Sequence, residues 1–172
     1  MNLEEVIQAK RLVDIVLYPA SELTYSGICL KANKHIWIMI NYDHKLKRLN
    51  GVSVFKNQII ETYSIWKKKA ISIHDANLEE YVSNLPIALM NTLHSSLKIA
   101  SGRGLIAVFT KDAQKSYKVG KVTAISKTCF SLKSVTKKGT WSQTQTIDFA
   151  NVDFFSFLTS YEYSLAQKLA MG

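Results

Sequence analysis

Residues 27–40 read GICLKANKHIWIMI and contain two apolar runs that are separated by a short polar segment. Isoleucines alternate with other side chains in the second run and therefore share one face of an extended strand: Ile36, Ile38 and Ile40. Gly27 permits a sharp bend in the first run, and Asn33-Lys34 provides the polar turn that reverses the chain. The stretch predicts two consecutive antiparallel strands, of which the first is strongly bent.

The β pattern extends to both sides of this hairpin. Asn2 and Glu5 have the spacing of a helix capping box, which predicts a short helix at the start of the chain. Runs rich in β-branched and aromatic residues follow at 13–18, 27–30, 35–40, 52–55 and 59–66. Five short consecutive strands are enough to close as a small barrel, so we expect one such unit in the first half.

The second half repeats this plan. A helix is predicted from Pro86 to about Ala100, followed by strands at 105–109, 118–125, 128–135, 140–149 and 152–158 and by a last helix at 160–171. Residues 11–16 match 103–108 with a shift of 92, and Gly27 to Trp37 matches Gly120 to Phe130 with a shift of 93. Two blocks with almost the same shift indicate an internal duplication.

The predicted fold class is therefore mainly β with flanking helices. It consists of two tandem five-stranded barrels, each preceded by a helix, and a C-terminal helix. The predicted organisation is a first helix and barrel at 1–68, a linker segment at 69–85, and a second helix, second barrel and C-terminal helix at 86–172.

A helix followed by five bent strands, with a glycine six residues before an Asn-Lys turn, resembles the Sm-like fold of the small SH3-like barrels. Two fused copies resemble uncharacterised bacterial proteins with tandem Sm-like barrels. The resemblance implies an RNA pocket in which an acidic residue and a Met-Asn pair grip a base. The matching positions carry other residues here: Asn33, Ile36 and Trp37 in the first copy, and Ser126, Cys129 and Phe130 in the second. We therefore expect the fold without that pocket.

Charge is concentrated in the second half. The chain has a formal net charge of +9, of which residues 1–85 contribute +2 and residues 86–172 contribute +7. A concentrated positive field attracts polyanions, and a tryptophan beside lysines offers a base a stacking surface. The candidate polyanion-binding residues are Lys121, Lys127, Lys133, Lys137, Lys138 and Trp141. The other interpretation is a solvated lysine face, with Trp141 packed against a neighbouring helix.

Other chemistry has little support in the sequence. Cys29 and Cys129 lie 100 residues apart, and the four histidines lack the close spacing of metal ligands. The acidic residues are scattered singly, so their spacing predicts no acid/base pair, and no cofactor, metal or catalytic residue is assigned. No apolar run approaches the roughly 18 residues of a membrane span, and the start of the chain lacks the pattern of a secretory signal. We expect a cytoplasmic protein.

Two hypotheses for function remain open. In the first, a non-catalytic binding protein engages RNA, single-stranded DNA or another polyanion through the basic second barrel. In the second, the tandem barrels form a protein-protein interaction module or oligomerising adaptor, which pairs through exposed strand edges with an acidic protein or with a second copy of the chain.

Overall fold

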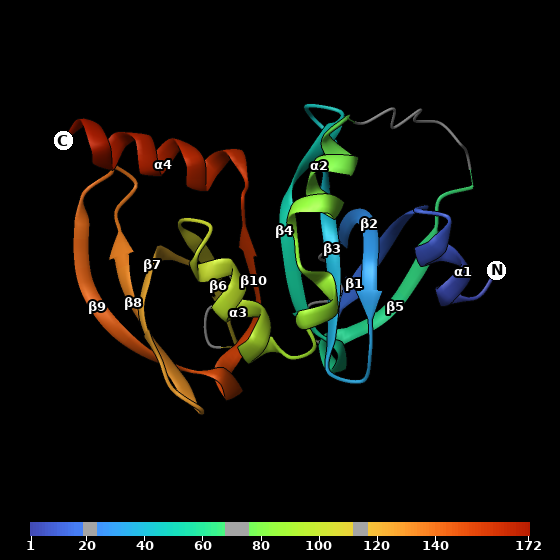
Figure 1. Cartoon of the computed structure of the whole chain (residues 1–172), viewed down its shortest axis with the longest axis horizontal. Coiled ribbons are helices and arrows are strands. Elements are labelled where there is room, and N and C mark those ends of the chain that lie inside the picture. Colours follow the sequence, from blue (N-terminus) through green and yellow to red (C-terminus); the bar gives the residue numbers. More distant parts are fainter. Residues whose placement is uncertain (19–23, 68–75, 112–116) are drawn as a thin grey trace.

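A computed structural model describes residues 1–18, 24–67, 76–111 and 117–172 (Figure 1). Its strands form one continuous antiparallel sheet of ten, in the order β5-β1-β2-β3-β4-β10-β6-β7-β8-β9. The strands of the first half are β1 (Leu12–Leu17), β2 (Thr24–Ala32), β3 (Ile36–Asp43), β4 (Arg48–Lys56) and β5 (Ile60–Ile65). Those of the second half are β6 (Ile106–Thr110), β7 (Lys118–Ile125), β8 (Cys129–Val135), β9 (Trp141–Asp148) and β10 (Val152–Phe157).

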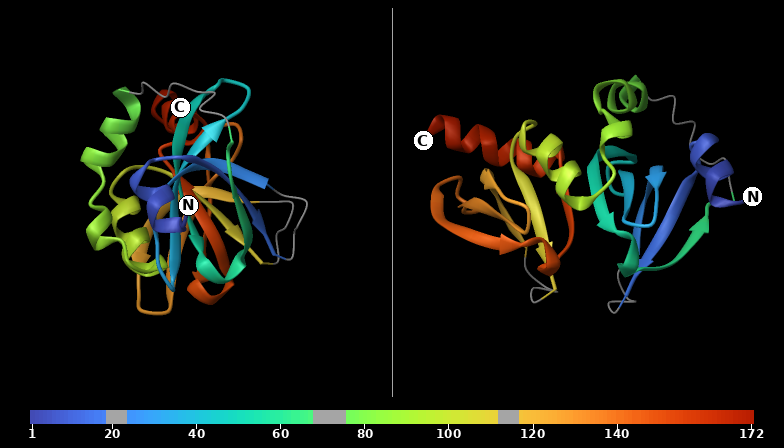
Figure 2. Two further views of the ribbon diagram at one scale, coloured as in Figure 1. Left: turned by 90° about the vertical axis from the view of Figure 1, so that its right-hand side faces the viewer. Right: turned by 60° about the horizontal axis from the view of Figure 1, so that its bottom comes forward.

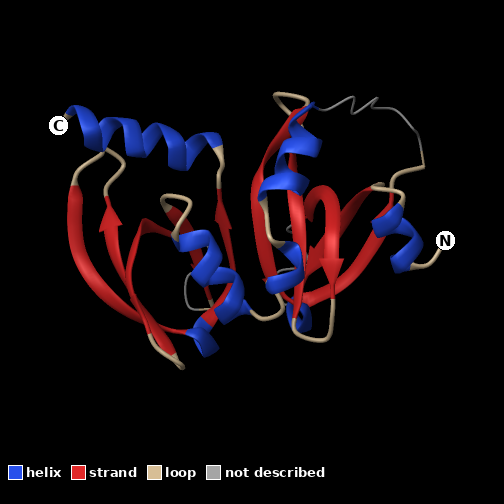
Figure 3. Cartoon of the chain, viewed as in Figure 1, coloured by secondary structure: helices blue, strands red, loops and turns tan. Residues whose placement is uncertain are grey.

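The predicted strands are thus present, and the sheet continues from one half of the chain into the other. The ladder of described strands runs from β5 to β9 as one open sheet, and β4 of the first half is hydrogen-bonded to β10 of the second. Figure 3 shows the strands of each half as a separate curved group. Each core contains residues of both halves, because β4 and β10 at the junction each contribute side chains to the core of the other half.

Four α-helices flank the sheet in the described part of the chain: α1 (Leu3–Gln8), α2 (Ala76–Asn84), α3 (Leu93–Ser101) and α4 (Ser160–Met171). The predicted capping box of α1 is confirmed, since Glu5 N donates to Asn2 Oδ1 and Asn2 N donates to Glu5 Oε2, each at 2.9 Å. The predicted linker at 69–85 includes α2 from residue 76 onward, while its first residues lie outside the described ranges.

The prediction of a helix beginning at Pro86 is wrong. Residues 87–89 form a short 3₁₀ turn, and α3 begins after Thr92, whose hydroxyl accepts from Ser95 N at 3.1 Å. Because Thr92 and Ser95 cap each other reciprocally, the helix starts at Leu93. Leu89, which lies in this turn, is 66% exposed.

Strand register confirms the duplication and corrects its alignment. Val13 lies opposite Gly27 in the first half, and Ile106 lies opposite Gly120 in the second. The shift is therefore 93 for both strands, and the shift of 92 predicted for residues 11–16 is wrong by one residue. Changing the alignment of a strand by one residue moves each side chain to the opposite face. With the corrected shift, Val13 is equivalent to Ile106, and both are buried in the cores of their units.

The glycines in the second strand of each unit allow a close backbone approach. A Cβ built on Gly27 would lie 2.1 Å from the carbonyl oxygen of Ile40, and one on Gly120 would lie 2.3 Å from that of Lys133. No other residue fits at either position, which supports the interpretation of these glycines as bending points.

The junction between β4 and β10 interleaves the two cores. Phe154 of β10 is buried in the core of the first unit, where its ring stacks on Phe55 with centroids 4.7 Å apart. Val52 and Val54 of β4 are fully buried in the core of the second unit together with α3. The right-hand view of Figure 2 shows the two curved groups of strands side by side, with α4 along the second and α2 beside the first.

Candidate functional site

Three of the predicted site residues converge on neighbouring strands of the second unit. Lys121 on β7 lies opposite Lys133 on β8, and Lys133 Nζ lies 4.8 Å from the ring centroid of Trp141 on β9. This is cation-π distance. Trp141 is 43% exposed, so one part of its ring holds the lysine and the rest faces solvent. The strands thus build a small surface of two ammonium groups and one aromatic ring.

Helix α4 adds a residue to this surface that the sequence analysis did not identify. Lys168, in the last turn of α4, donates from Nζ to the carbonyl oxygen of Lys137 at 3.4 Å. The turn that carries Lys137 and Lys138 packs closely against this helix, because Gly139 has a φ of +78° and lies against Lys168. Lys168 follows Leu165, which is buried beneath α4, by three residues. Because residues three apart are neighbours on a helix, the spacing already placed Lys168 near the side of α4 that faces the sheet.

We call these residues the basic patch: Lys121, Lys133, Lys137, Lys138, Trp141 and Lys168. Lys127 does not belong to it. Lys127 lies in the turn that joins the end of β7 to the start of β8. The residues of the basic patch on these two strands lie farther from this turn. The seven residues of β8 separate this turn from Lys137 by about 20 Å at the usual rise of a strand.

Among the described residues, no carboxylate forms an ion pair with the basic patch. Within the described ranges, the ion pair found within 4.0 Å joins the N-terminal ammonium and Glu5, far from this surface. Trp141 lies opposite Val135, a member of the cluster beneath α4, and is itself 43% exposed. The cluster beneath α4 consists of Leu105, Ala107, Val119, Val135 and Leu165, with Phe109 and Leu169 at its border, and does not include Trp141.

The positions that the resemblance to Sm proteins matched to an RNA pocket are occupied by turn-forming and core residues. Asn33 Oδ1 accepts from the backbone nitrogens of His35 and Ile36 at 2.7 and 2.9 Å and so closes the turn. Ile36 and Trp37 are buried in the cores, and Phe130 is likewise buried in the second unit. The side chains at these positions therefore serve the fold.

The fold brings together three polar side chains whose proximity could not be predicted from their spacing in the chain. Asp14 and Ser26 face each other across β1 and β2, with Ser26 Oγ 2.5 Å from Asp14 Oδ1 and 2.8 Å from His44 Nε2. Ser26 lies between the other two, whereas activation of a serine nucleophile requires the histidine in the middle. His44 also stacks on Trp66 with ring centroids 5.5 Å apart. We assign the group a structural role at the end of β3.

The two outer edges of the sheet form a second candidate surface. The 93-residue shift between the halves makes β9 the equivalent of β4. In this alignment, Thr144 and Thr146 of β9 take the positions of Val52 and Val54 of β4. Thr62 of β5 likewise corresponds to Phe154 of β10. All three threonines are exposed. The inner junction therefore carries valine and phenylalanine where the two outer edges carry threonine, and it also buries the paired residues Ser53 and Ser156.

Two further searches complete the description of the chain. None of the helices in the described ranges is long and apolar enough to cross a bilayer, and the described side chains contain no group of three or more His, Cys, Asp or Glu that could hold a metal ion. Comparison with protein-family models, curated proteins and solved structures finds no match to the chain.

Proposed function

We propose that the chain is a tandem pair of Sm-like barrels and acts as a non-catalytic binding protein. The equal order of strands in the two halves, fifth-first-second-third-fourth, supports the barrel assignment, as does the 93-residue shift. The ligand that we propose is single-stranded nucleic acid, held non-specifically at the basic patch.

The observation that carries this proposal is the contact between Lys133 and the half-exposed ring of Trp141. Single-stranded nucleic acid offers flat bases for stacking and phosphates for lysines, and base stacking on an aromatic residue contributes about 1–3 kcal/mol. An acidic protein would use the lysines and leave the tryptophan without a matching group. Because lysine greatly outnumbers arginine in the chain, we expect little sequence preference.

The polar sheet edges argue against the alternative, an adaptor that oligomerises by repeating its inner junction. A second copy added at β9 and β5 would bury Thr144, Thr146 and Thr62, whereas the inner junction has Val52, Val54 and Phe154 at the same positions. The serines that the inner junction buries, Ser53 and Ser156, lie opposite each other. Burying an unpaired hydroxyl costs about 1–3 kcal/mol in proteins, so the same geometry would be unstable at the outer edges.

Fluorescence anisotropy with labelled oligo(U) and oligo(dT) tests the proposal. We expect Trp141→Ala and the double variant Lys133→Ala/Lys137→Ala to weaken binding about fivefold or more, and affinity to fall steeply with salt. Trp141→Phe, which keeps a smaller ring, should lie between the wild type and Trp141→Ala. Lys45→Ala in the first unit is the matched control. Absence of binding at low salt, or equal affinity for Trp141→Ala and the wild type, would refute the proposal.

A further inference from the structure

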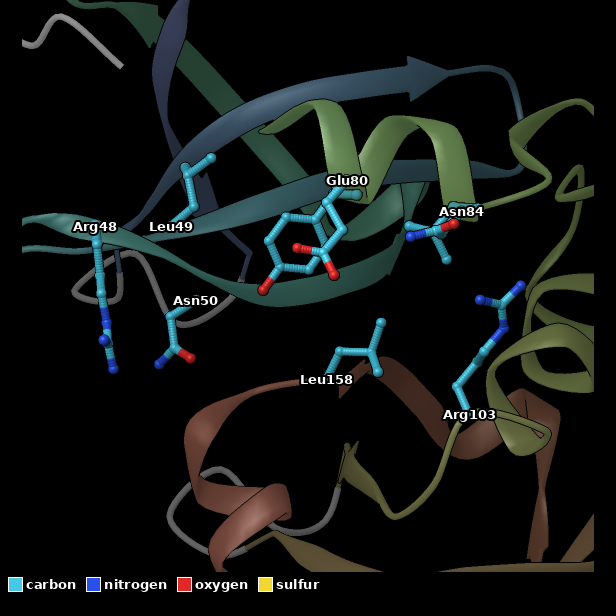
Figure 4. A pocket seen from close by; sticks show the side chains of 9 residues that line it. Arg48, Leu49, Asn50, Glu80, Asn84, Arg103 and Leu158 are labelled. Carbon is cyan, nitrogen blue, oxygen red and sulfur yellow. The ribbon is translucent and has the colours of Figure 1, made fainter. Parts of the chain in front are cut away.

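A polar cleft lies between the two units, on residues that the basic patch does not use (Figure 4). Its volume is about 450 Å³, within the range of small-molecule sites. The end of α2, the start of β4, the loop after α3 and the corner before α4 contribute its walls. The lining residues are Arg48, Leu49, Asn50, Glu80, Tyr81, Asn84, Leu85, Arg103 and Leu158.

Three charged side chains in the cleft are not paired with one another. The chain has three arginines, of which Arg48 and Arg103 line this cleft. In the described part of the chain, neither has a carboxylate within 4.0 Å, and Glu80 has no cation within that distance. Figure 4 shows the two arginines at opposite ends, with Glu80 between them. The cleft therefore presents two free guanidinium groups and one free carboxylate to a ligand.

Hydrogen bonds fix the walls of the cleft. Gly51 N donates to the Tyr81 hydroxyl at 2.9 Å and joins β4 to α2, while Ser160 N donates to Asn50 Oδ1 at 2.8 Å and joins β4 to α4. The second bond leaves the Asn50 amide nitrogen as a donor beside Arg48. These contacts hold the cleft in one shape without a ligand, which lowers the entropic cost of binding.

The corner before α4 places an apolar side chain in the cleft at an energetic cost. Leu158 has a φ of +61°, a left-handed conformation that non-glycine residues rarely adopt, and its side chain is 38% exposed. Tyr81 provides a ring on the α2 side. A strained, exposed leucine and a tyrosine that line the same charged cleft are suited to a flat apolar group.

We propose that this cleft binds a guanine nucleotide. Guanine presents two acceptors, O6 and N7, which an arginine fork contacts in bidentate fashion, and N–H donors on the neighbouring edge, which a carboxylate accepts. Arg103 and Glu80 match these two edges. Arg48, with the Asn50 amide beside it, matches the phosphate. Adenine presents a donor in place of O6 and an acceptor in place of the N1 hydrogen, so it opposes both Arg103 and Glu80.

Isothermal titration calorimetry with guanosine 5′-monophosphate, guanosine and adenosine 5′-monophosphate tests this assignment. We expect the guanine nucleotide to bind about tenfold more tightly than either of the others, since each lacks one matching part. Arg48→Ala should lower the affinity for the nucleotide to that for guanosine. Glu80→Gln and Arg103→Ala should remove the preference for guanine over adenine.

All three substitutions fall on exposed side chains, so the variants should keep the wild-type circular dichroism spectrum. Lys45→Ala, in the turn beside the cleft but outside its lining, is the matched control and should bind as the wild type does. Equal binding of the two nucleotides, no heat at millimolar nucleotide, or unchanged affinity in Arg48→Ala would overturn the proposal. These outcomes are independent of the basic patch, because the two sites share no residue.

Discussion

Replacement of Phe154 by alanine tests whether the two units share their cores. Phe154 belongs to β10, yet its ring stacks on Phe55 of β4 and Phe109 of β6 with centroids 4.7 and 4.1 Å apart, and Tyr25 meets it edge-on at 5.3 Å. The side chain is 5% exposed. Truncation of a buried phenylalanine costs about 3–5 kcal/mol, and the three aromatic neighbours place this residue at the upper end of the range.

Chemical denaturation by guanidinium chloride, followed by far-ultraviolet circular dichroism, measures this loss. Because Phe154 fills the core of the first unit from a strand of the second, amide hydrogen exchange should accelerate in β3 as well as in β6. Phe154→Leu should cost less, since most of the volume remains. Tyr163→Ala on exposed α4 surface should change the free energy of unfolding by less than about 0.5 kcal/mol. A loss below about 1 kcal/mol for Phe154→Ala, or protection unchanged in β3, would refute the shared core.

Three more predictions concern single sites. Gly51→Ala should lower the melting temperature, since Gly51 has a φ of +78° and an added Cβ would lie 2.4 Å from Thr159; a melting temperature equal to that of the wild type contradicts this. Burial raises the pKa of Glu162 above its ordinary value, so the native state binds the proton more tightly and stability should fall as pH rises from that value through the raised pKa. Glu162→Gln, which keeps an acceptor for Ser156, should abolish this fall, and a parallel stability profile of the two proteins from pH 4 to 7 would exclude it. Burial raises the pKa of Cys29 to about 12, so this thiol should resist alkylation at pH 8 in the native protein, and rapid labelling before unfolding would disprove that.

Much of the local structure was predictable because it depends on neighbouring residues. The capping box at Asn2 and Glu5 and the bending points at Gly27 and Gly120 follow from spacing and backbone geometry, and the structure confirms them. The start of α3 was mispredicted because Pro86 is a common first helical residue, whereas the cap at Thr92 uses a serine that the Ser/Thr-x-x-Glu/Gln pattern does not include.

The candidate sites were less predictable. Lysine density indicated the region of the basic patch, but only the strand register places Lys133 over Trp141, and only the docking of α4 adds Lys168. Lys127 lies apart from the basic patch because it is in the turn of the β7–β8 hairpin, whereas Lys137 follows the far end of β8. Arg48 and Arg103, which are 55 positions apart in the sequence, share a cleft because the two units pair through β4 and β10.

The sequence by itself determined the strands, the capping box of α1, the duplication and the concentration of charge in the second half, because each depends on periodicity, backbone sterics or composition. The tertiary structure decided which strand edges meet. Backbone hydrogen bonds are the same for every residue, so the pairing of β4 with β10 depends on whether the covered faces are apolar, as at Val52, Val54 and Phe154, or polar, as at Thr144, Thr146 and Thr62. That difference is visible only after the register is known, and it makes one junction a shared core and leaves the other two edges open.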